Sequence, residues 1–128
     1  MNKSPISLKK SFKSFGFALN GLRIVVQEQN NARIHVLVAL GAIIAGILLK
    51  NSPGEWIAIC LAIGMVLISE IFNSAIEYVA DFLSPDYHPL IKKIKDLSAG
   101  AVLISAVIAV IIGIIIYLPK IITICSTR

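Results

Sequence analysis

Three long apolar runs, separated by short turn-forming or polar segments, constrain this chain more than any other feature. The runs cover residues 34–49, 56–82 and 97–118. A helix needs about 20 apolar residues to cross the hydrocarbon core of a bilayer. The second and third runs meet this requirement, and the first meets it if it is slightly extended. With 57% hydrophobic residues in a chain of 128, an ordinary soluble domain is excluded. We therefore predict one all-α integral membrane domain, residues 1–128.

The basic residues indicate how this domain is oriented. Nine of the twelve lysines and arginines precede the first apolar run or lie in the loop 84–96. Because positively charged loops stay in the cytoplasm, the pattern predicts membrane helices at about 34–50, 55–82 and 97–118, with the N-terminus inside and the C-terminus outside. The same distribution explains the net charge of +5 as a topology signal, so no nucleic acid partner is expected. No signal peptide is expected either, because no cleavage motif follows the first run.

The segment before the first run has the pattern of an amphipathic helix. Its apolar residues are spaced four, three, four, three and four apart, which places them on one helical face: Leu8, Phe12, Phe15, Leu19, Leu22 and Val26. Lysines and an arginine occupy much of the remaining surface. We predict a helix at about residues 6–31 that lies in the membrane interface. Packing of the same face on the rest of the bundle is an alternative, and both can hold at once.

Small residues recur inside the apolar runs. Gly41 and Ala45 form one pair four residues apart, and Ala42 and Gly46 form another. The third run opens with the sequence SAGA, residues 98–101. Small residues at this spacing let helix backbones approach closely in lipid, so we expect close helix contacts at these positions.

The second run ends in an unusual stretch, SEIFNSAIEYVAD, from Ser69 to Asp81. At about 100° per residue, its polar side chains fall on one stripe about 16 Å long, formed by Glu70, Asn73, Ser74, Glu77 and Asp81. Such a stripe cannot face lipid, so it must face a protein interior or a wet cleft. Ionisable groups at membrane depth are costly and usually functional.

Basic and amide side chains flank this stripe in the predicted topology. Lys92, Lys93 and Lys95 follow it, and the junction before the first run carries Glu28, Gln29, Asn30, Asn31, Arg33 and His35. Deep carboxylates with a basic rim suit a metal-bound polyphosphate, although the chain has no P-loop motif. Two alternatives are buried salt bridges that only hold the bundle together and a proton or cation pathway. The pathway is disfavoured because residues 56–68 offer no polar steps.

Three segments resemble one known family: EIFNSAIEYVAD (70–81), HPLIKKIKDLSAGAVLI (88–104) and NNARIH (30–35). Together they resemble the prokaryotic diacylglycerol kinase and undecaprenol kinase family of small integral-membrane lipid kinases, over about residues 10–118. The resemblance implies an enzyme of the bacterial inner membrane that phosphorylates a lipid hydroxyl with ATP and Mg²⁺. It also implies a homotrimer with shared active sites, which agrees with the expectation that one chain can hardly bury this stripe alone. Diacylglycerol and undecaprenol are equally compatible substrates.

The resemblance also implies roles for individual residues. Glu70 matches the general base and Glu77 a ligand of the ATP-bound Mg²⁺, with Asn73 beside it. Asp81 and Asn31 are supporting polar residues. The nucleotide-binding positions are Lys10, Phe17, Gln29, Glu77, Asp86, Tyr87, His88, Lys95 and Asp96.

One position departs from the family pattern. The family commonly has a second metal-binding Glu four residues before Arg33, where this chain has Gln29, and the acid is at Glu28 instead. Neighbouring helical residues point about 100° apart. Either the Gln29 carbonyl binds the metal, or the helix start shifts so that Glu28 reaches it, or activity is weakened. We predict retained activity; the alternative is a non-catalytic lipid-binding member or a small membrane transporter.

Overall fold

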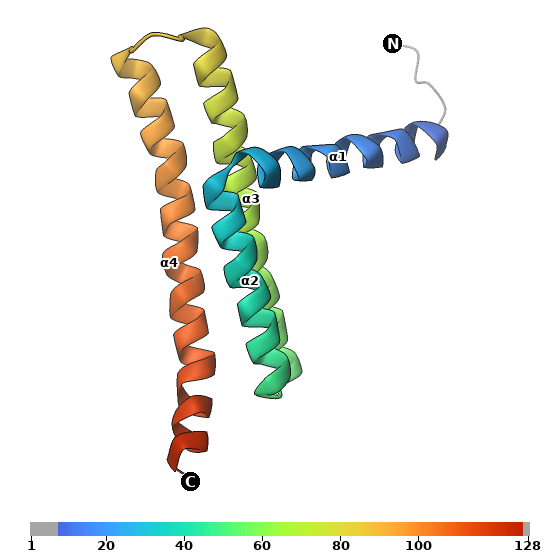
Figure 1. Cartoon of the computed structure of the whole chain (residues 1–128), viewed down its shortest axis with the longest axis vertical. Helices are drawn as coiled ribbons and strands as arrows, with labels where there is room; N and C mark the ends of the chain where they lie inside the picture. The colour runs from blue at the N-terminus through green and yellow to red at the C-terminus, as the bar shows by residue number, and fades with distance from the viewer. Residues whose placement is uncertain (1–7, 127–128) are drawn as a thin grey trace.

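The computed structural model describes residues 8–126, with side chains from residue 12 onward, and this part of the chain is helical with short connections (Figure 1). It forms α1 (Leu8–Glu28), α2 (Asn30–Leu48), α3 (Pro53–Leu83) and α4 (Pro89–Ser126). The last three are long and apolar enough to cross a membrane. The fold is thus that of an integral membrane helical protein, as the composition predicts.

The three long helices form a bundle, and α1 leaves it nearly at a right angle (Figure 1). At about 1.5 Å per residue, the 19 residues of α2 span about 28 Å, close to the ~30 Å hydrocarbon core. The 31 residues of α3 and 38 of α4 are longer than that core requires. Both helices extend past the start of α2, beyond the level of α1. We call this the α1 end of the bundle, and the opposite end, where α2 turns into α3, the turn end.

Arg33 holds the sharp corner between α1 and α2. Gln29 has an extended backbone (φ −101°, ψ 116°), which ends α1. From the first turn of α2, the Arg33 guanidinium donates to Val26 O at 2.9 Å and also to Gln27 O. Because the last carbonyls of a helix lack partners within it, a basic side chain that satisfies them stabilises the helix end. The corner is therefore fixed by a specific side chain rather than by a flexible linker.

The connection between α2 and α3 is equally well defined. Lys50 has a positive φ of 51°, and the bonds from Lys50 N to Ile47 O and from Asn51 N to Gly46 O complete a Schellman motif. Ser52 and Glu55 then form a capping box at the start of α3, with Pro53 in the first turn. Each turn residue thus satisfies a backbone group that the helix ends leave open.

Gly46 is the small residue that matters most for packing. A Cβ atom there would lie 2.8 Å from the Trp56 ring and 2.9 Å from the Asn51 amide nitrogen. The equivalent atoms at Gly41 and Gly100 would meet nothing within 4 Å. The expected close helix contact is therefore found at Gly46, whereas Gly41 and Gly100 make none with the described residues.

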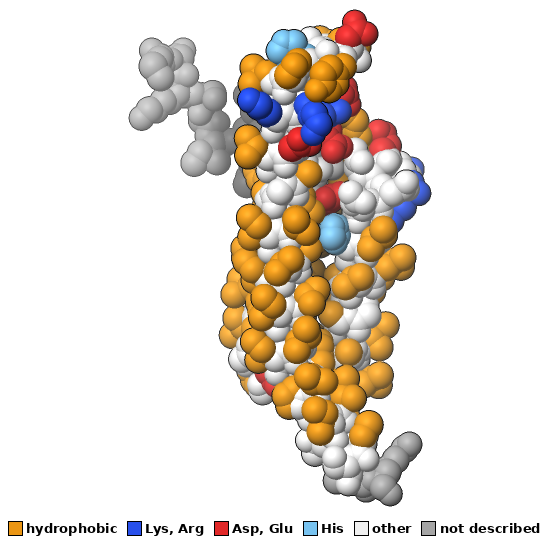
Figure 2. Space-filling view, turned by 90° about the vertical axis from the view of Figure 1, so that its left-hand side faces the viewer, with side chains coloured by type: hydrophobic (Ala, Val, Ile, Leu, Met, Phe, Trp, Pro, Cys, Tyr) orange, Lys and Arg blue, Asp and Glu red, His pale blue; other side chains and the backbone are white. Residues whose placement is uncertain are grey.

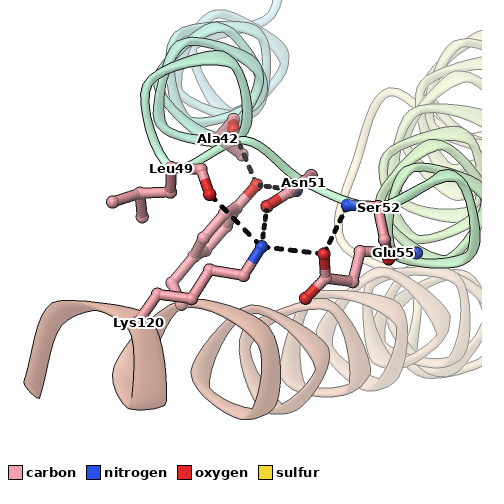
Figure 3. A network of polar contacts seen from close by, with 7 residues as sticks. Ala42, Leu49, Asn51, Ser52, Glu55 and Lys120 are labelled. Atoms are coloured by element: carbon pink, nitrogen blue, oxygen red, sulfur yellow. Dashed lines mark hydrogen bonds and ion pairs between the residues drawn. The ribbon is translucent and has the colours of Figure 1, made fainter. Parts of the chain in front are cut away.

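A polar network ties the three long helices together at the turn end (Figure 3). Lys120 Nζ from α4 lies 2.7 Å from Glu55 Oε2 and 2.8 Å from Asn51 Oδ1, and it also approaches Leu49 O. The Tyr117 hydroxyl donates to Ala42 O at 2.7 Å and receives a bond from Asn51 Nδ2. We call Asn51, Glu55, Tyr117 and Lys120 the turn-end cluster.

Most large apolar side chains of the bundle are exposed on its outer faces, while charged groups gather mainly at the α1 end (Figure 2). This distribution suits a surface in contact with lipid or with other membrane helices. On α1, the apolar stripe from Phe12 to Val26 is also exposed, with Phe12 at 79%. That stripe therefore does not pack on the bundle of its own chain. The side chain of Leu8 lies outside the described residues.

Candidate functional site

The polar stripe of α3 changes from buried to exposed along its length. The solvent-exposed fraction is only 2% for Glu70, 6% for Asn73 and 1% for Ser74. Further along the stripe, Glu77 is half-buried and Asp81 is exposed. The expectation that one chain can hardly bury this stripe is wrong for its deep part. The reason is that α4 packs along α3 and presents the small residues Ser98 and Ser105, both buried.

A short chain of hydrogen bonds links the middle of the stripe to α4. The Asn73 side chain donates from Nδ2 to Glu77 Oε1 at 3.3 Å, and its Oδ1 lies 2.7 Å from the Ser98 hydroxyl. One turn deeper, the Ser69 and Ser105 hydroxyls are 2.8 Å apart. Asn73 is therefore held in one orientation, with its amide group directed at Glu77.

Glu70 is the exception to this pattern of paired groups. Its Oε2 atom is fully buried and has no hydrogen-bond partner among the described residues. His35 of α2 and Glu77 interact with it electrostatically. A buried polar atom without a partner costs free energy, so such an atom in a native fold requires an explanation.

Lysines at the tip of the bundle pair with the exposed acids. Lys95 Nζ lies 2.6 Å from Asp81 Oδ1, and Lys92 pairs with Asp96 one turn along α4. The hydrogen bond to Asp81 raises the pKa of Lys95, which lies before the apolar part of α4 and remains cationic. Lys95 and Asp96, both predicted to contact the nucleotide, thus have separate partners in this structure.

The corner between α1 and α2 brings a further acid to α3. The Tyr78 hydroxyl donates to Glu28 Oε2 at 2.7 Å, and the Gln29 side chain lies close to the same hydroxyl. Tyr78 directly follows Glu77 in the sequence. Both candidates for the second metal ligand are therefore near the stripe, and Glu28 is the one with a direct hydrogen bond to α3.

Several predicted nucleotide-binding residues do not join this arrangement. Phe17 and Tyr87 are 67% and 79% exposed, and Phe17 has Lys13 Nζ over its ring at 5.9 Å. Asp86 and His88 lie in the loop after α3, about 20 Å beyond Glu70 at 1.5 Å per residue, and Asn31 is exposed at the corner. The side chain of Lys10 lies outside the described residues. The nucleotide roles of Lys10, Phe17, Asp86, Tyr87 and His88, and the supporting polar role of Asn31, remain predictions.

The structure also brings in polar residues to which the sequence analysis gave no role. Tyr78 contacts Glu28, Ser98 orients Asn73, and Ser69 meets Ser105. From the sequence, Ser98 is predicted only to belong to a run of small packing residues. The separation of Ser98 and Asn73 along the sequence does not predict their hydrogen bond, because that contact depends on how α3 and α4 pack.

The residues that could hold a metal are oxygen donors from two elements. Glu77 and Asn73 lie on α3, and Glu28, at the end of α1, accepts a hydrogen bond from Tyr78, the residue after Glu77. No cluster of three or more His, Cys, Asp or Glu side chains occurs among the described residues. Nucleotide-bound Mg²⁺ commonly needs only one or two carboxylates in addition to the phosphates. The donor set therefore fits Mg²⁺ bound together with a nucleotide.

Comparisons with known proteins match most of this chain. The family model described as prokaryotic diacylglycerol kinase matches residues 16–117. An undecaprenol kinase of Bacillus subtilis is 41% identical over 113 residues, which are 88% of this chain and 92% of that protein. A diacylglycerol kinase of Synechocystis is 36% identical over 111 residues, 86% of this chain and 63% of the relative. A diacylglycerol kinase of Escherichia coli K12 is 30% identical over 111 residues, 87% and 91% of the two chains.

Proposed function

The chain belongs to the prokaryotic diacylglycerol kinase family, and we propose that it is a lipid kinase that transfers the γ-phosphoryl group of ATP to the hydroxyl of a membrane lipid, either diacylglycerol or undecaprenol. The observation that carries this proposal is the buried Glu70 carboxylate, whose Oε2 atom has no partner among the described residues. A group kept unpaired at such a cost is expected where a substrate supplies the missing partner.

The depth of Glu70 suits a lipid hydroxyl. His35 in the second turn of α2 interacts with it electrostatically, and α2 begins where α1 meets the bundle (Figure 1). With the positive-inside orientation, this level is the cytoplasmic surface, and α1 would lie in the interface with its exposed Phe12 and Phe15 toward lipid. A lipid alcohol would then present its hydroxyl at Glu70, while Glu77 and Asp81 lie further out, toward water and ATP.

In the proposed reaction, Glu70 acts as general base. It takes the proton from the lipid hydroxyl, the hydroxyl oxygen forms a bond to the γ-phosphorus, and the bond between that phosphorus and the β–γ bridging oxygen breaks to release ADP. Such transfers depend mainly on positioning and on neutralisation of charge. Lys95 would contribute positive charge at the rim, together with the predicted nucleotide contacts of Lys10, Phe17, Asp86, Tyr87, His88 and Asp96.

Glu77 and Glu28 would hold the Mg²⁺ that accompanies ATP, with Asn73 orienting the Glu77 carboxylate. Mg²⁺ supplies neutralisation of phosphate charge when it is bound. The hydrogen bond from Tyr78 to Glu28 favours this acid over Gln29 as the second ligand. A homotrimer with shared sites, as the family resemblance implies, would cover the exposed apolar faces of the bundle.

The decisive experiment is a phosphorylation assay on the purified protein in lipid nanodiscs, with Mg-ATP and either diacylglycerol or undecaprenol. We expect phosphorylated lipid from at least one alcohol and a strong loss with Glu77→Gln. No product from either alcohol would contradict the proposal. In that case, calorimetric titration with Mg-ATP separates the remaining possibilities, since a non-catalytic lipid-binding protein or a small transporter need not bind nucleotide.

The choice between Glu28 and Gln29 can be tested without turnover. Mn²⁺ in place of Mg²⁺ allows the affinity for the metal–nucleotide complex to be followed by electron paramagnetic resonance. We expect Glu28→Gln to weaken this affinity about tenfold or more, since a carboxylate ligand is lost, and Gln29→Asn to change it little. The reverse order would assign the second ligand to Gln29.

A further inference from the structure

Glu28 is the last residue of α1, and the backbone on either side of it is held by hydrogen bonds. Gln29 N donates to Val25 O at 2.9 Å, which closes the final turn of α1. From the first turn of α2, the Arg33 guanidinium donates to Val26 O at 2.9 Å. The corner between α1 and α2 therefore fixes the backbone position of Glu28, and only its side chain is left to be oriented.

Tyr78 of α3 orients that side chain. Its hydroxyl donates to Glu28 Oε2 at 2.7 Å, close to the length of about 2.5–2.7 Å that is typical of a strong hydrogen bond to a carboxylate. Glu28 is exposed, so burial does not hold its carboxylate in place. Its side chain makes no other hydrogen bond or ion pair with the described residues. The Tyr78 hydroxyl is thus the contact on which the orientation of this acid depends.

The hydrogen bond leaves most of the Glu28 carboxylate available. A carboxylate has two oxygens and about four lone-pair sites, so a bond at Oε2 keeps Oε1 open for a cation. An exposed glutamate without such a bond would lose its rotamer freedom only when the cation binds, which weakens binding. Carboxylates that bind metals are commonly held by a hydrogen bond from a neighbouring group. The pair of Tyr78 and Glu28 already has this arrangement.

The same hydroxyl explains how the acid at Glu28 can replace the one expected at Gln29. Gln29 has an extended backbone (φ −101°, ψ 116°), so the rotation of about 100° between neighbouring helical residues does not apply to this pair. The side chains of both residues lie close to the Tyr78 hydroxyl. Of the two, the carboxylate accepts the hydrogen bond from that hydroxyl.

We propose that Tyr78 is a positioning residue for the metal–nucleotide site: its hydroxyl holds Glu28 where this acid serves as the second carboxylate ligand of Mg²⁺, and it thereby compensates for Gln29. This inference rests on the proposed function, which places Mg²⁺ at Glu77, the residue before Tyr78. Tyr78 itself contacts neither the metal nor the lipid. Its proton stays on the hydroxyl, and Glu28 binds the cation with its remaining oxygen.

The central test is Tyr78→Phe in nanodiscs, with binding of the Mn²⁺–ATP complex followed by electron paramagnetic resonance. We expect the affinity to fall about tenfold. This is the lower end of the 10- to 100-fold loss usual for removing the partner of a metal ligand, because water can replace the hydroxyl at an exposed site. In the lipid phosphorylation assay, the KM for Mg-ATP should rise, whereas the KM for the lipid and the kcat at saturating Mg-ATP should not change.

A double variant shows whether Tyr78 acts through Glu28. Glu28→Ala removes the acceptor of the hydrogen bond together with the carboxylate ligand. If Tyr78 only positions this acid, Tyr78→Phe should weaken Mn²⁺–ATP binding little further in the Glu28→Ala background, since both changes act on one interaction. Fully additive losses would show that Tyr78 acts by another route, and the inference would be wrong.

Tyr117→Phe is the matched control, because it removes the same hydroxyl from a tyrosine at the turn end, where that group is bonded to Ala42 O. We expect it to leave Mn²⁺–ATP affinity unchanged. Unchanged affinity in Tyr78→Phe as well would overturn the positioning role.

The outcome for Tyr78 is separate from the outcome for the proposed function. If Tyr78→Phe has no effect while the wild type phosphorylates lipid, the proposed function stands and only the positioning role is lost. If the wild type phosphorylates neither diacylglycerol nor undecaprenol, the proposed function fails, and this inference fails with it.

Discussion

At the turn end of the bundle, Lys120, Glu55 and Asn51 bond one another and the backbone (Figure 3). At the α1 end, the same types of side chain are arranged differently: Asp81 and Lys95 are paired at the exposed rim, and Glu70 is buried with an unpartnered oxygen. Both regions place acids, lysines and amides on long apolar helices. The polar groups of the turn end thus bond one another across three helices, whereas the α1 end leaves one buried carboxylate oxygen open, at the place proposed for the substrate hydroxyl.

The largest effect is expected when one carboxylate at each end of the bundle is replaced by an amide and the two variants are compared. Glu70→Gln should lower kcat for lipid phosphorylation about 10²- to 10⁴-fold, the usual contribution of a general base. Its unfolding midpoint should stay equal or rise, because no side-chain hydrogen bond is lost. Glu55→Gln, which alters the only Asp or Glu of the chain outside the proposed site, is the matched control.

For Glu55→Gln we expect the opposite result: near-normal activity per folded molecule and a lower unfolding midpoint in detergent. The two variants are measured side by side by product formation and by denaturant unfolding. Comparable activity in Glu70→Gln and the wild type would show that the Glu70 carboxylate has no catalytic role, and the functional difference between the two ends would be contradicted.

Lys120→Met tests the stability of the turn-end cluster directly. The change leaves Glu55 and Asn51 without their shared donor, and the Lys120 and Glu55 side chains are only 24% and 27% exposed. We expect a loss of about 1–3 kcal/mol in the free energy of unfolding, toward the lower end because water still reaches the pair. The double variant with Glu55→Gln should lose less than the sum of the two single variants, since they act on one interaction.

Gly46→Ala addresses the packing beneath the cluster. Its new methyl group would lie 2.8 Å from the Trp56 ring, so the ring or the helix must shift, at a cost of about 1–3 kcal/mol. Gly41→Ala, five residues earlier on the same helix, meets nothing within 4 Å and should leave stability nearly unchanged. Equal effects of the two variants would show that helix propensity, rather than contact with Trp56, decides the result.

The smallest effect is expected from the exposed ion pair at the α1 end. Asp81→Asn removes the partner of Lys95, but the two side chains are 65% and 35% exposed. Exposed pairs contribute about 0–1 kcal/mol, so the unfolding midpoint should shift little. A loss as large as that of Lys120→Met would contradict the distinction between the two ends. Lys92→Gln, which removes another exposed pair on α4, is the matched control.

Much of the fold was accessible from periodicity and hydropathy. The three spans and the helical segment before them follow from apolar runs and their breakers, and Pro53 stands at the break where α3 begins. The capping box of Ser52 and Glu55 is also a local pattern. The partners of Glu28 were not accessible, because they depend on the corner that Arg33 fixes between α1 and α2. That corner brings Glu28 to Tyr78, fifty positions later in the chain.

The candidate site also has one part that the sequence predicts and one part that depends on contacts between helices. The stripe of Glu70, Asn73, Glu77 and Asp81 is a consequence of helical geometry alone, because residues three or four apart share one face. Which of these side chains is satisfied depends on the neighbouring helices: Ser98 of α4 fixes Asn73, Lys95 pairs with Asp81, and no donor of the described residues reaches Glu70 Oε2.

The sequence by itself therefore determined the class of the protein, its membrane helices and the face that carries its acids, since these follow from local spacing and composition. Only the tertiary structure decided that Glu55 is paired with Lys120, while Glu70 Oε2 is buried without a partner among the described residues. The physical reason is that hydrogen bonding and burial depend on contacts between helices, and the packing of three helices sets those contacts over separations of tens of residues.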